Sequence, residues 1–281
     1  MTWTELTDGV YLRRHQELDL TTGLVAGAER CLVIDTRGDV DQGAELAASV
    51  RELTDRPWAV VYTHAHFDHS YGTTAFLPCD VWAHQRCLPE LVEHGEAAKV
   101  KWAEHYREAG KPEIADALGR TGIMPPDRLV TTRQELDLGG RTAVLVHPGP
   151  AHTDHDLVVH VPDARIVFAG DVVEHGPEGF TADSFSGESD LLGWPRALEA
   201  ILALEPRIVV PGHGDAVGPE FLRRHRAGLL RLNELKAAVE AGKTGPDEAL
   251  AASPYPADVT RAALAAGAGL SRSSAHRNGC A

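Results

Sequence analysis

The stretch THAHFDHS, residues 63–70, directly follows the apolar run AVVY at 59–62. It places three imidazoles and one carboxylate within six residues: His64, His66, Asp68 and His69. These are ligand types that zinc accepts, and a loop at the end of a strand can turn several of them inward. The adjacent Asp68 and His69 point differently from the alternating pair His64 and His66. The four groups therefore suit two neighbouring ions better than one.

For a lone His-x-His pair, a polar surface loop is the better interpretation. Three further segments reverse that preference, because each sets a metal-competent side chain at or just beyond the end of an apolar strand. They are GPAHTDHD (149–156) with His152, IVFAGD (166–171) with Asp171, and IVVPGHGD (208–215) with His213. A common metal site explains all four segments.

Short apolar runs rich in β-branched residues predict strands, and apolar residues three and four positions apart predict helices. Helices are expected from Gln42, from Pro195 to about residue 205, and beyond Pro219. The predicted strands are 9–12, 23–26, 31–34, 59–62, 142–147, 157–161, 166–169 and 208–210.

Residues 84–128 are charged, helix-forming and bounded by proline and glycine, which indicates a helical insertion. Strands followed by a helix occur on both sides of it. This order predicts an α+β fold in which two sheets pack face to face with helices outside. We expect one domain over residues 1–243 and a C-terminal helical extension over 244–281, whose last segment, SRSSAHRNGCA, is polar and expected to be frayed.

Composition restricts the partners. The 281 residues carry a formal charge of −14, which disfavours nucleic acid. No apolar run reaches the length of a membrane span, and the first residues lack the pattern of an export signal. The four cysteines form no CxxC pair, which suits a reducing compartment. We therefore expect a cytoplasmic protein that acts on a small molecule; the oligomeric state is left open.

The pattern HxHxDH is complete at residues 64–69, and the sequence resembles the metallo-β-lactamase fold superfamily from about Gly9 to Asp215. The resemblance implies a four-layer αββα sandwich with a dinuclear site in a groove at one edge of the sheets. Matching the motifs gives one ion to His64, His66 and His152, the other to Asp68, His69 and His213, and a bridging role to Asp171. Zinc is preferred, although iron or manganese also accepts such ligands.

These features predict a zinc-dependent hydrolase that attacks an ester, thioester, lactone or amide through a metal-bound hydroxide. Asp68 is expected to orient that hydroxide and to carry a proton to the leaving group. Relatives with this motif also include mononuclear iron oxidoreductases acting on sulfur compounds, and β-lactamases. A purely structural metal module is disfavoured, because a structural zinc closes four ligands around one ion.

The insertion, over 88–128, is expected to form helices that cover the groove. Trp102, Tyr106 and Met124 would then contact an apolar part of the substrate, unless they only pack the insertion onto the sandwich. We expect Asp154 and His155 to lie outside the ligand set. On the charged helices, solvent exposure is expected for His84, His94 and His105.

Two positions argue against β-lactams as preferred substrates. Lactamases with a cysteine at the position matching Asp171 commonly carry a lysine three residues later, where this sequence has Glu174. A carboxylate there would repel the carboxylate of the substrate. Asp156 stands where those enzymes have an asparagine, and an ionised aspartate donates no hydrogen bond to an oxyanion.

Overall fold

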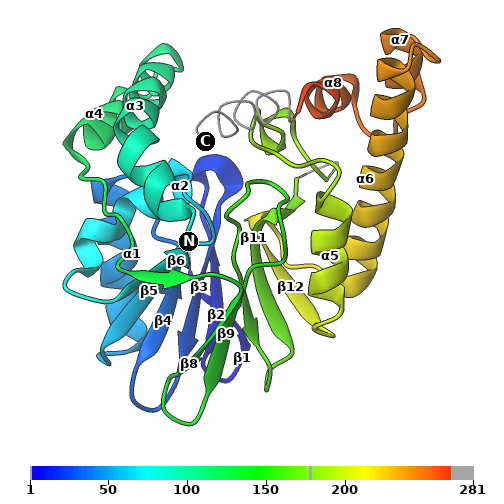
Figure 1. The fold of residues 1–281 in the computed structure, drawn as a ribbon. Coiled ribbons are helices and arrows are strands. Elements are labelled where there is room, and N and C mark those ends of the chain that lie inside the picture. The colour runs from blue at the N-terminus through cyan, green and yellow to red at the C-terminus, as the bar shows by residue number, and fades with distance from the viewer. Residues whose placement is uncertain (1, 177–178, 267–281) are drawn as a thin grey trace, which may run out of the picture.

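Two β-sheets lie face to face at the centre of the computed structural model, which describes residues 2–176 and 179–266 (Figure 1). The first sheet has seven strands in sequence order: β1 (Thr4–Thr7), β2 (Val10–Arg14), β3 (Thr21–Ala26), β4 (Cys31–Ile34), β5 (Trp58–Val61), β6 (Val81–His84) and β7 (Arg128–Val130). From β4 to β7 the neighbouring strands are parallel. Their carboxyl ends therefore meet at one edge of the sheet.

The second sheet has five strands in the order β12-β11-β10-β9-β8. They are β8 (Arg133–Asp137), β9 (Thr142–Val146), β10 (Val158–Val161), β11 (Ile166–His175) and β12 (Ile208–Gly214). Only the pair β11 and β12 is parallel within this sheet.

Each sheet is apolar on both faces, because each lies between the other sheet and a layer of helices. Leu32 and Ile34 of β4 belong to the apolar cluster between the sheets, whereas Cys31 and Val33 of the same strand pack with the helices of the first layer. The strand period of two thus divides one run of four apolar residues between two cores.

Helices cover the outer faces of both sheets (Figure 1). The first sheet is covered by α1 (Val40–Leu53), α2 (Phe67–Ser70), α3 (Cys87–Glu108) and α4 (Pro112–Arg120). The second is covered by α5 (Trp194–Leu202) and α6 (Pro219–Glu240). The predicted αββα sandwich is confirmed.

The start of α1 shows how the sequence sets a helix boundary. Asp39 has extended backbone angles, and its carboxylate accepts hydrogen bonds from the N–H groups of Asp41 and Gln42. These are otherwise unpaired donors of a first helical turn. Leu46 and Val50, four positions apart, then bury one face of the helix against the first sheet.

The helical insertion is shorter than predicted. Its two helices, α3 and α4, connect the adjacent strands β6 and β7, and β6 takes up the predicted beginning of the insertion. His84 is consequently the last residue of β6 and is buried, stacked on His147 with ring centroids 4.2 Å apart. The expectation that it is solvated on a helix is wrong, because the first helix of the insertion, α3, begins only at Cys87.

The C-terminal extension forms α7 (Pro246–Ala251) and α8 (Ala257–Ala265). Val259 and Ala263 of α8 join the apolar cluster that holds α5 and α6. The division into residues 1–243 and 244–281 stays a prediction, and SRSSAHRNGCA lies outside the described residues. None of the helices in the described part of the chain has the length and apolarity needed to cross a bilayer.

Candidate metal centre

Four segments of the chain bring the predicted ligands together at one edge of the sandwich. The residues after β5 carry the HxHxDH motif, with Asp68 and His69 on α2. His152 lies between β9 and β10, Asp171 in β11 and His213 in β12. All seven predicted side chains fall into two neighbouring groups.

The first group consists of His64, His66, His152 and Asp171, whose candidate ligand atoms lie within 4.8 Å of one another. His66 Nδ1 is 3.0 Å from His152 Nε2. Asp171 Oδ2 is 3.7 Å from His64 Nε2 and 3.6 Å from His152 Nε2. Three imidazoles and one carboxylate match the donor set of a zinc ion.

The second group consists of Asp68, His69 and His213. Asp68 Oδ2 lies 3.3 Å from His213 Nε2 and 3.5 Å from His69 Nε2. Asp171 reaches this group as well, since its Oδ1 is 3.2 Å from His69 Nε2 and its Oδ2 is 3.3 Å from His213 Nε2. One carboxylate thus touches both groups.

Every histidine of the two groups is held through its other ring nitrogen. His152 Nδ1 is 3.0 Å from the carbonyl oxygen of Ser184, and His213 Nδ1 is 2.8 Å from that of Leu18. The remaining partners are the Thr63 hydroxyl for His64, Glu188 for His66 and Asp35 for His69. An acceptor on one nitrogen fixes the proton there and leaves the other nitrogen unprotonated toward the site, as metal-binding histidines require.

The buried atoms also fit a cation. His64 is 1% exposed, and its Nε2 has no hydrogen-bond partner among the described residues. Burial lowers the pKa of His152 to about 4 and that of His64 well below its ordinary value. Both are therefore neutral near pH 7, the form that binds a metal. A buried nitrogen without a partner is costly unless a ligand satisfies it.

Two glycines give Asp171 its place. Gly170 has a φ of +52°, and the pairing of β11 with β12 is irregular on either side of it. A Cβ on Gly212 would lie 1.9 Å from Asp171 Oδ1, so only glycine leaves room for this carboxylate. Both strands were predicted to end earlier; β11 continues to His175 and β12 to Gly214. Because the strand pairing is irregular around Gly170, the sequence pattern does not predict that the two strands continue.

Asp35 is a central residue that the sequence reasoning did not select. It follows β4, is 1% exposed and accepts hydrogen bonds from the Thr63 N–H and hydroxyl at 2.7 and 2.8 Å. Its Oδ2 is also 2.8 Å from His69 Nδ1. The rule that found Asp171, a carboxylate at the end of an apolar strand, applies equally to Asp35.

Glu188 was not predicted either, because SFSGE carries no ligand pattern. Its Oε1 is 3.1 Å from His66 Nε2, which leaves His66 Nδ1 toward the site. We expect Glu188→Ala to weaken binding of one metal ion about tenfold. Glu188→Gln keeps an acceptor and should retain most of the affinity. Competition with a chelating dye measures this, and equal affinities for the wild type and the alanine variant would contradict it.

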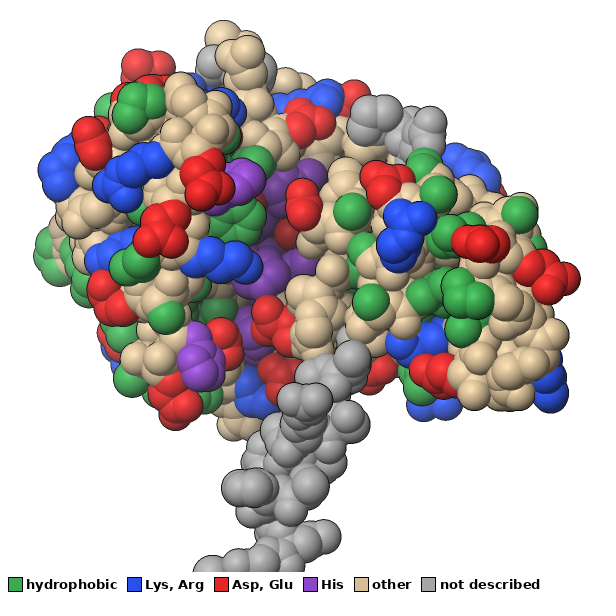
Figure 2. All heavy atoms as spheres, turned by 90° about the horizontal axis from the view of Figure 1, so that it is seen from above, with side chains coloured by type: hydrophobic (Ala, Val, Ile, Leu, Met, Phe, Trp, Pro, Cys, Tyr) green, Lys and Arg blue, Asp and Glu red, His purple; other side chains and the backbone are tan. Residues whose placement is uncertain are grey.

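Five members of the two groups line a cavity of about 270 Å³: His66, Asp68, His152, Asp171 and His213. Figure 2 shows histidines gathered in a hollow between the two halves of the molecule. Leu18, Phe67 and Trp102 form an apolar part of the cavity wall. Trp102 stacks on Phe67 with ring centroids 4.4 Å apart. The insertion therefore reaches the cavity through Trp102.

Two of the three aromatic and apolar contacts predicted from the insertion are not made. Tyr106 is 2% exposed, and its hydroxyl is 3.0 Å from Glu17. Met124 does not line the cavity; its carbonyl oxygen accepts the Tyr62 hydroxyl at 2.9 Å. Both hold the insertion on the sandwich, which was the competing interpretation.

Glu174 lines the cavity, so it can face a bound substrate as the sequence comparison with β-lactamases predicted. It accepts the Ser184 hydroxyl at 2.7 Å, and burial together with Asp171 raises its pKa to about 8. Asp156 does not reach the cavity at all, so it cannot contact a substrate in either protonation state. Its two carboxylate oxygens accept the N–H and hydroxyl of Thr153, so it closes the turn that carries His152 and does not line the cavity.

His155 and Asp154 lie outside the ligand groups, as expected. The structure nevertheless gives His155 a supporting contact, because its Nε2 accepts the N–H of Ala65 at 3.2 Å. Asp154 holds the other nitrogen of that ring at 3.0 Å. The pair thus fixes the loop between His64 and His66.

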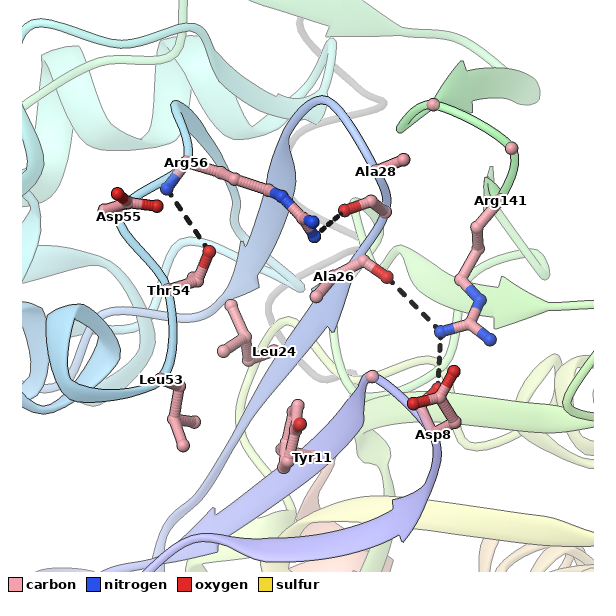
Figure 3. A pocket seen from close by; sticks show the side chains of 14 residues that line it. Asp8, Tyr11, Leu24, Ala26, Ala28, Leu53, Thr54, Asp55, Arg56 and Arg141 are labelled. Atoms are coloured by element: carbon pink, nitrogen blue, oxygen red, sulfur yellow. Dashed lines mark hydrogen bonds between the residues drawn. The ribbon is translucent and has the colours of Figure 1, made fainter.

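A larger cavity, about 560 Å³, lies at the opposite end of the sandwich among the turns that precede β2, β5 and β9 (Figure 3). Arg141 donates to the carbonyl oxygens of Asp8 and Ala26, and Arg56 donates to that of Gly27. These guanidinium groups brace neighbouring turns. Size alone therefore does not identify the functional site.

Comparison with known proteins agrees with this geometry. The family model of the metallo-β-lactamase superfamily matches residues 18–213. An acyl-coenzyme A thioesterase, MBLAC2 of Gallus gallus, is 30% identical over 213 residues, which cover 72% of this chain and 74% of the relative. A linear primary-alkylsulfatase from a Pseudomonas species is 25% identical over 244 residues, and the alignment spans only 45% of that longer protein.

Among solved structures, a metallo-β-lactamase from Pontibacter korlensis superposes with a TM-score of 0.63 at 20% identity, over 81% of this chain and 98% of that one. At that identity the likeness concerns the fold. The family model covers most of the chain and includes all seven predicted ligands and the whole HxHxDH motif, with His213 at its last position. This chain belongs to the metallo-β-lactamase superfamily.

Proposed function

We propose that the protein is a dinuclear, zinc-dependent hydrolase of small-molecule thioesters or esters. The observation that carries the proposal is the position of Asp171, whose carboxylate lies within 3.2 to 3.7 Å of histidines from both ligand groups. His64, His66 and His152 would hold one ion, and Asp68, His69 and His213 the other.

Two bound divalent cations would lower the pKa of water toward neutrality and polarise the scissile carbonyl oxygen. The protein residues orient the reactants. Asp68 lies on the cavity wall, 8% exposed, and is placed to position the attacking water and to pass its proton to the leaving group. Phe67 and Trp102 would hold an apolar acyl group beside the carbonyl.

Among the substrates considered, the thioester is supported by the similarity to an acyl-coenzyme A thioesterase. The cavity itself favours a substrate whose reacting part is uncharged, because Asp19 and Asp183 line it and no lysine or arginine does so among the described residues. Lactones and amides remain members of the same test panel.

Elemental analysis and a substrate panel test the proposal together. Protein purified without chelator and supplied with zinc should contain two zinc ions per chain and hydrolyse acyl thioesters or esters. A single iron ion, with oxidation of a sulfur compound and no hydrolysis, would establish the oxidoreductase alternative instead. A stoichiometry that stays at one ion in zinc-replete buffer would contradict the dinuclear site.

We further expect β-lactams to be poor substrates. Glu174 on the cavity wall offers no positive charge to a substrate carboxylate in either protonation state, and above its pKa of about 8 it would also repel that carboxylate. The measurement is kcat/KM for penicillins and carbapenems beside thioesters and esters. A value well above about 10⁴ M⁻¹s⁻¹ for a β-lactam, with slower thioester turnover, would show that the protein is a β-lactamase.

A further inference from the structure

A second cavity, about 530 Å³, adjoins the metal cavity. It lies between the end of β11, the first half of α6 and the segment before α8. Gly176 lines both cavities, so the two meet at the residue that follows β11. A molecule that reacts at the metal centre would enter this second space by passing Gly176.

The two cavities carry opposite charge. Among its described lining residues, the second cavity has Arg224 and Arg231 and no aspartate or glutamate. Arg231 is paired with Glu234 at 2.9 Å, whereas Arg224 has no carboxylate partner within the described part of the chain. In a chain with 41 acidic and 27 basic residues, an arginine left unpaired beside a cavity is an available anion contact.

The wall of the second cavity is aromatic. His175 is 4.8 Å from Phe221, and Phe221 is 4.7 Å from His225, measured between ring centroids. Behind them, Phe180 stacks on His225 at 3.9 Å. Tyr255 also lines the space. Such faces accept a planar ring by stacking.

His225 supplies an independent sign of a missing ligand. The side chain is 4% exposed and belongs to the cavity wall, yet its Nε2 has no hydrogen-bond partner among the described residues. Buried polar atoms in folded proteins are normally paired. The nitrogen itself has almost no accessible surface, so a polar ligand in the cavity would reach it only after a shift of a neighbouring side chain.

We propose that this second cavity binds a planar ring that bears phosphate, namely the nucleotide portion of an acyl thioester carrier. Arg224 would hold the phosphate, and Phe221, His225 and Tyr255 would contact the ring. The proposal rests on the thioesterase function proposed above. In this binding mode the phosphate lies away from the acidic residues of the metal cavity, and the uncharged thioester reaches the proposed ions.

Arg223 and Arg224 offer a matched pair of variants. Both are exposed residues of α6, but only Arg224 lines the cavity, and Arg223 is paired with Glu220. With the zinc-loaded protein, calorimetry should show ADP binding that weakens about tenfold in Arg224→Ala and is unchanged in Arg223→Ala. The KM for acyl-coenzyme A should also rise about tenfold in Arg224→Ala with kcat unchanged. The KM for the matching N-acetylcysteamine thioester, which lacks the nucleotide, should stay constant.

Absence of ADP binding at millimolar concentration, or equal effects of the two alanine variants, would overturn the proposal. ADP binding that depends on Arg224, with no difference between the two thioesters, would overturn its assignment to the substrate and leave a free nucleotide as the ligand. If no thioester or ester is hydrolysed, the proposed function fails, whereas binding of ADP through Arg224 still supports the cavity as a nucleotide site.

Discussion

Replacing Asp171 by alanine should lower kcat/KM roughly a thousandfold or more, a loss of about 4 kcal/mol of transition-state stabilisation. The reason is that one carboxylate serves both ligand groups, with Oδ1 3.2 Å from His69 Nε2 and Oδ2 3.6 Å from His152 Nε2. In the proposed dinuclear site, its removal would leave the two cations without a negative charge between them. Metal content and activity should therefore fall together.

The matched control is Asp183→Ala. Asp183 lines the same cavity but belongs to neither ligand group. This variant should keep two ions per chain. If Asp171→Ala also retains two ions at full occupancy, measured by elemental analysis after gel filtration, Asp171 does not bridge them.

Replacing Asp35 by asparagine should weaken binding of the ion held by His69 by up to about a hundredfold, although Asp35 contacts neither ion. His69 Nδ1 now donates to a carboxylate oxygen at 2.8 Å, and the Thr63 N–H and hydroxyl share the same acceptor group. An amide presents one acceptor instead of two, so one buried donor loses its partner. That loss should also destabilise the metal-free protein by about 1 to 3 kcal/mol.

Urea unfolding of the chelated protein measures the second effect, and chelator competition measures the first. Asp55→Asn is the control, since Asp55 is exposed in the turn before β5 and distant from the site. Asp35→Asn with wild-type stability but weakened metal binding would limit Asp35 to orienting His69. Wild-type metal affinity together with wild-type stability in Asp35→Asn would show that Asp35 neither orients His69 nor stabilises the fold.

The sequence determined the features that depend on local chemistry and on strand ends. HxHxDH packs its ligands into six residues, and parallel strands such as β4 and β5 deliver their carboxyl ends to one edge. The position of Asp171 after an apolar run was therefore enough to place it beside the motif. The order of strands followed by a helix, on both sides of the insertion, likewise predicted two sheets packed face to face with helices outside.

Only the tertiary structure decided which residues from distant parts of the chain contact one another at the site. Glu188 sits in a segment without a ligand pattern, yet it meets His66 after 122 residues of intervening chain. Asp156 was compared with an asparagine of the lactamases by its position in the sequence, but both its carboxylate oxygens accept hydrogen bonds from Thr153 within its own turn. Contacts of this kind depend on how loops fold over one another, and no periodicity in the sequence encodes them.

The same physical reason distinguishes the metal-binding residues, which the sequence identified, from the second cavity, which it did not. The ligand types and their spacing determined that this protein carries a metal-competent site of the superfamily, because coordination chemistry restricts which residues serve. The cavity that joins this site at Gly176 was decided by the packing of α6 and the C-terminal segment against the end of β11. Its arginine and aromatic residues lie on one helix and one loop that the sequence marks only as amphipathic and surface-exposed, so their convergence beside the metal centre exists only in the folded chain.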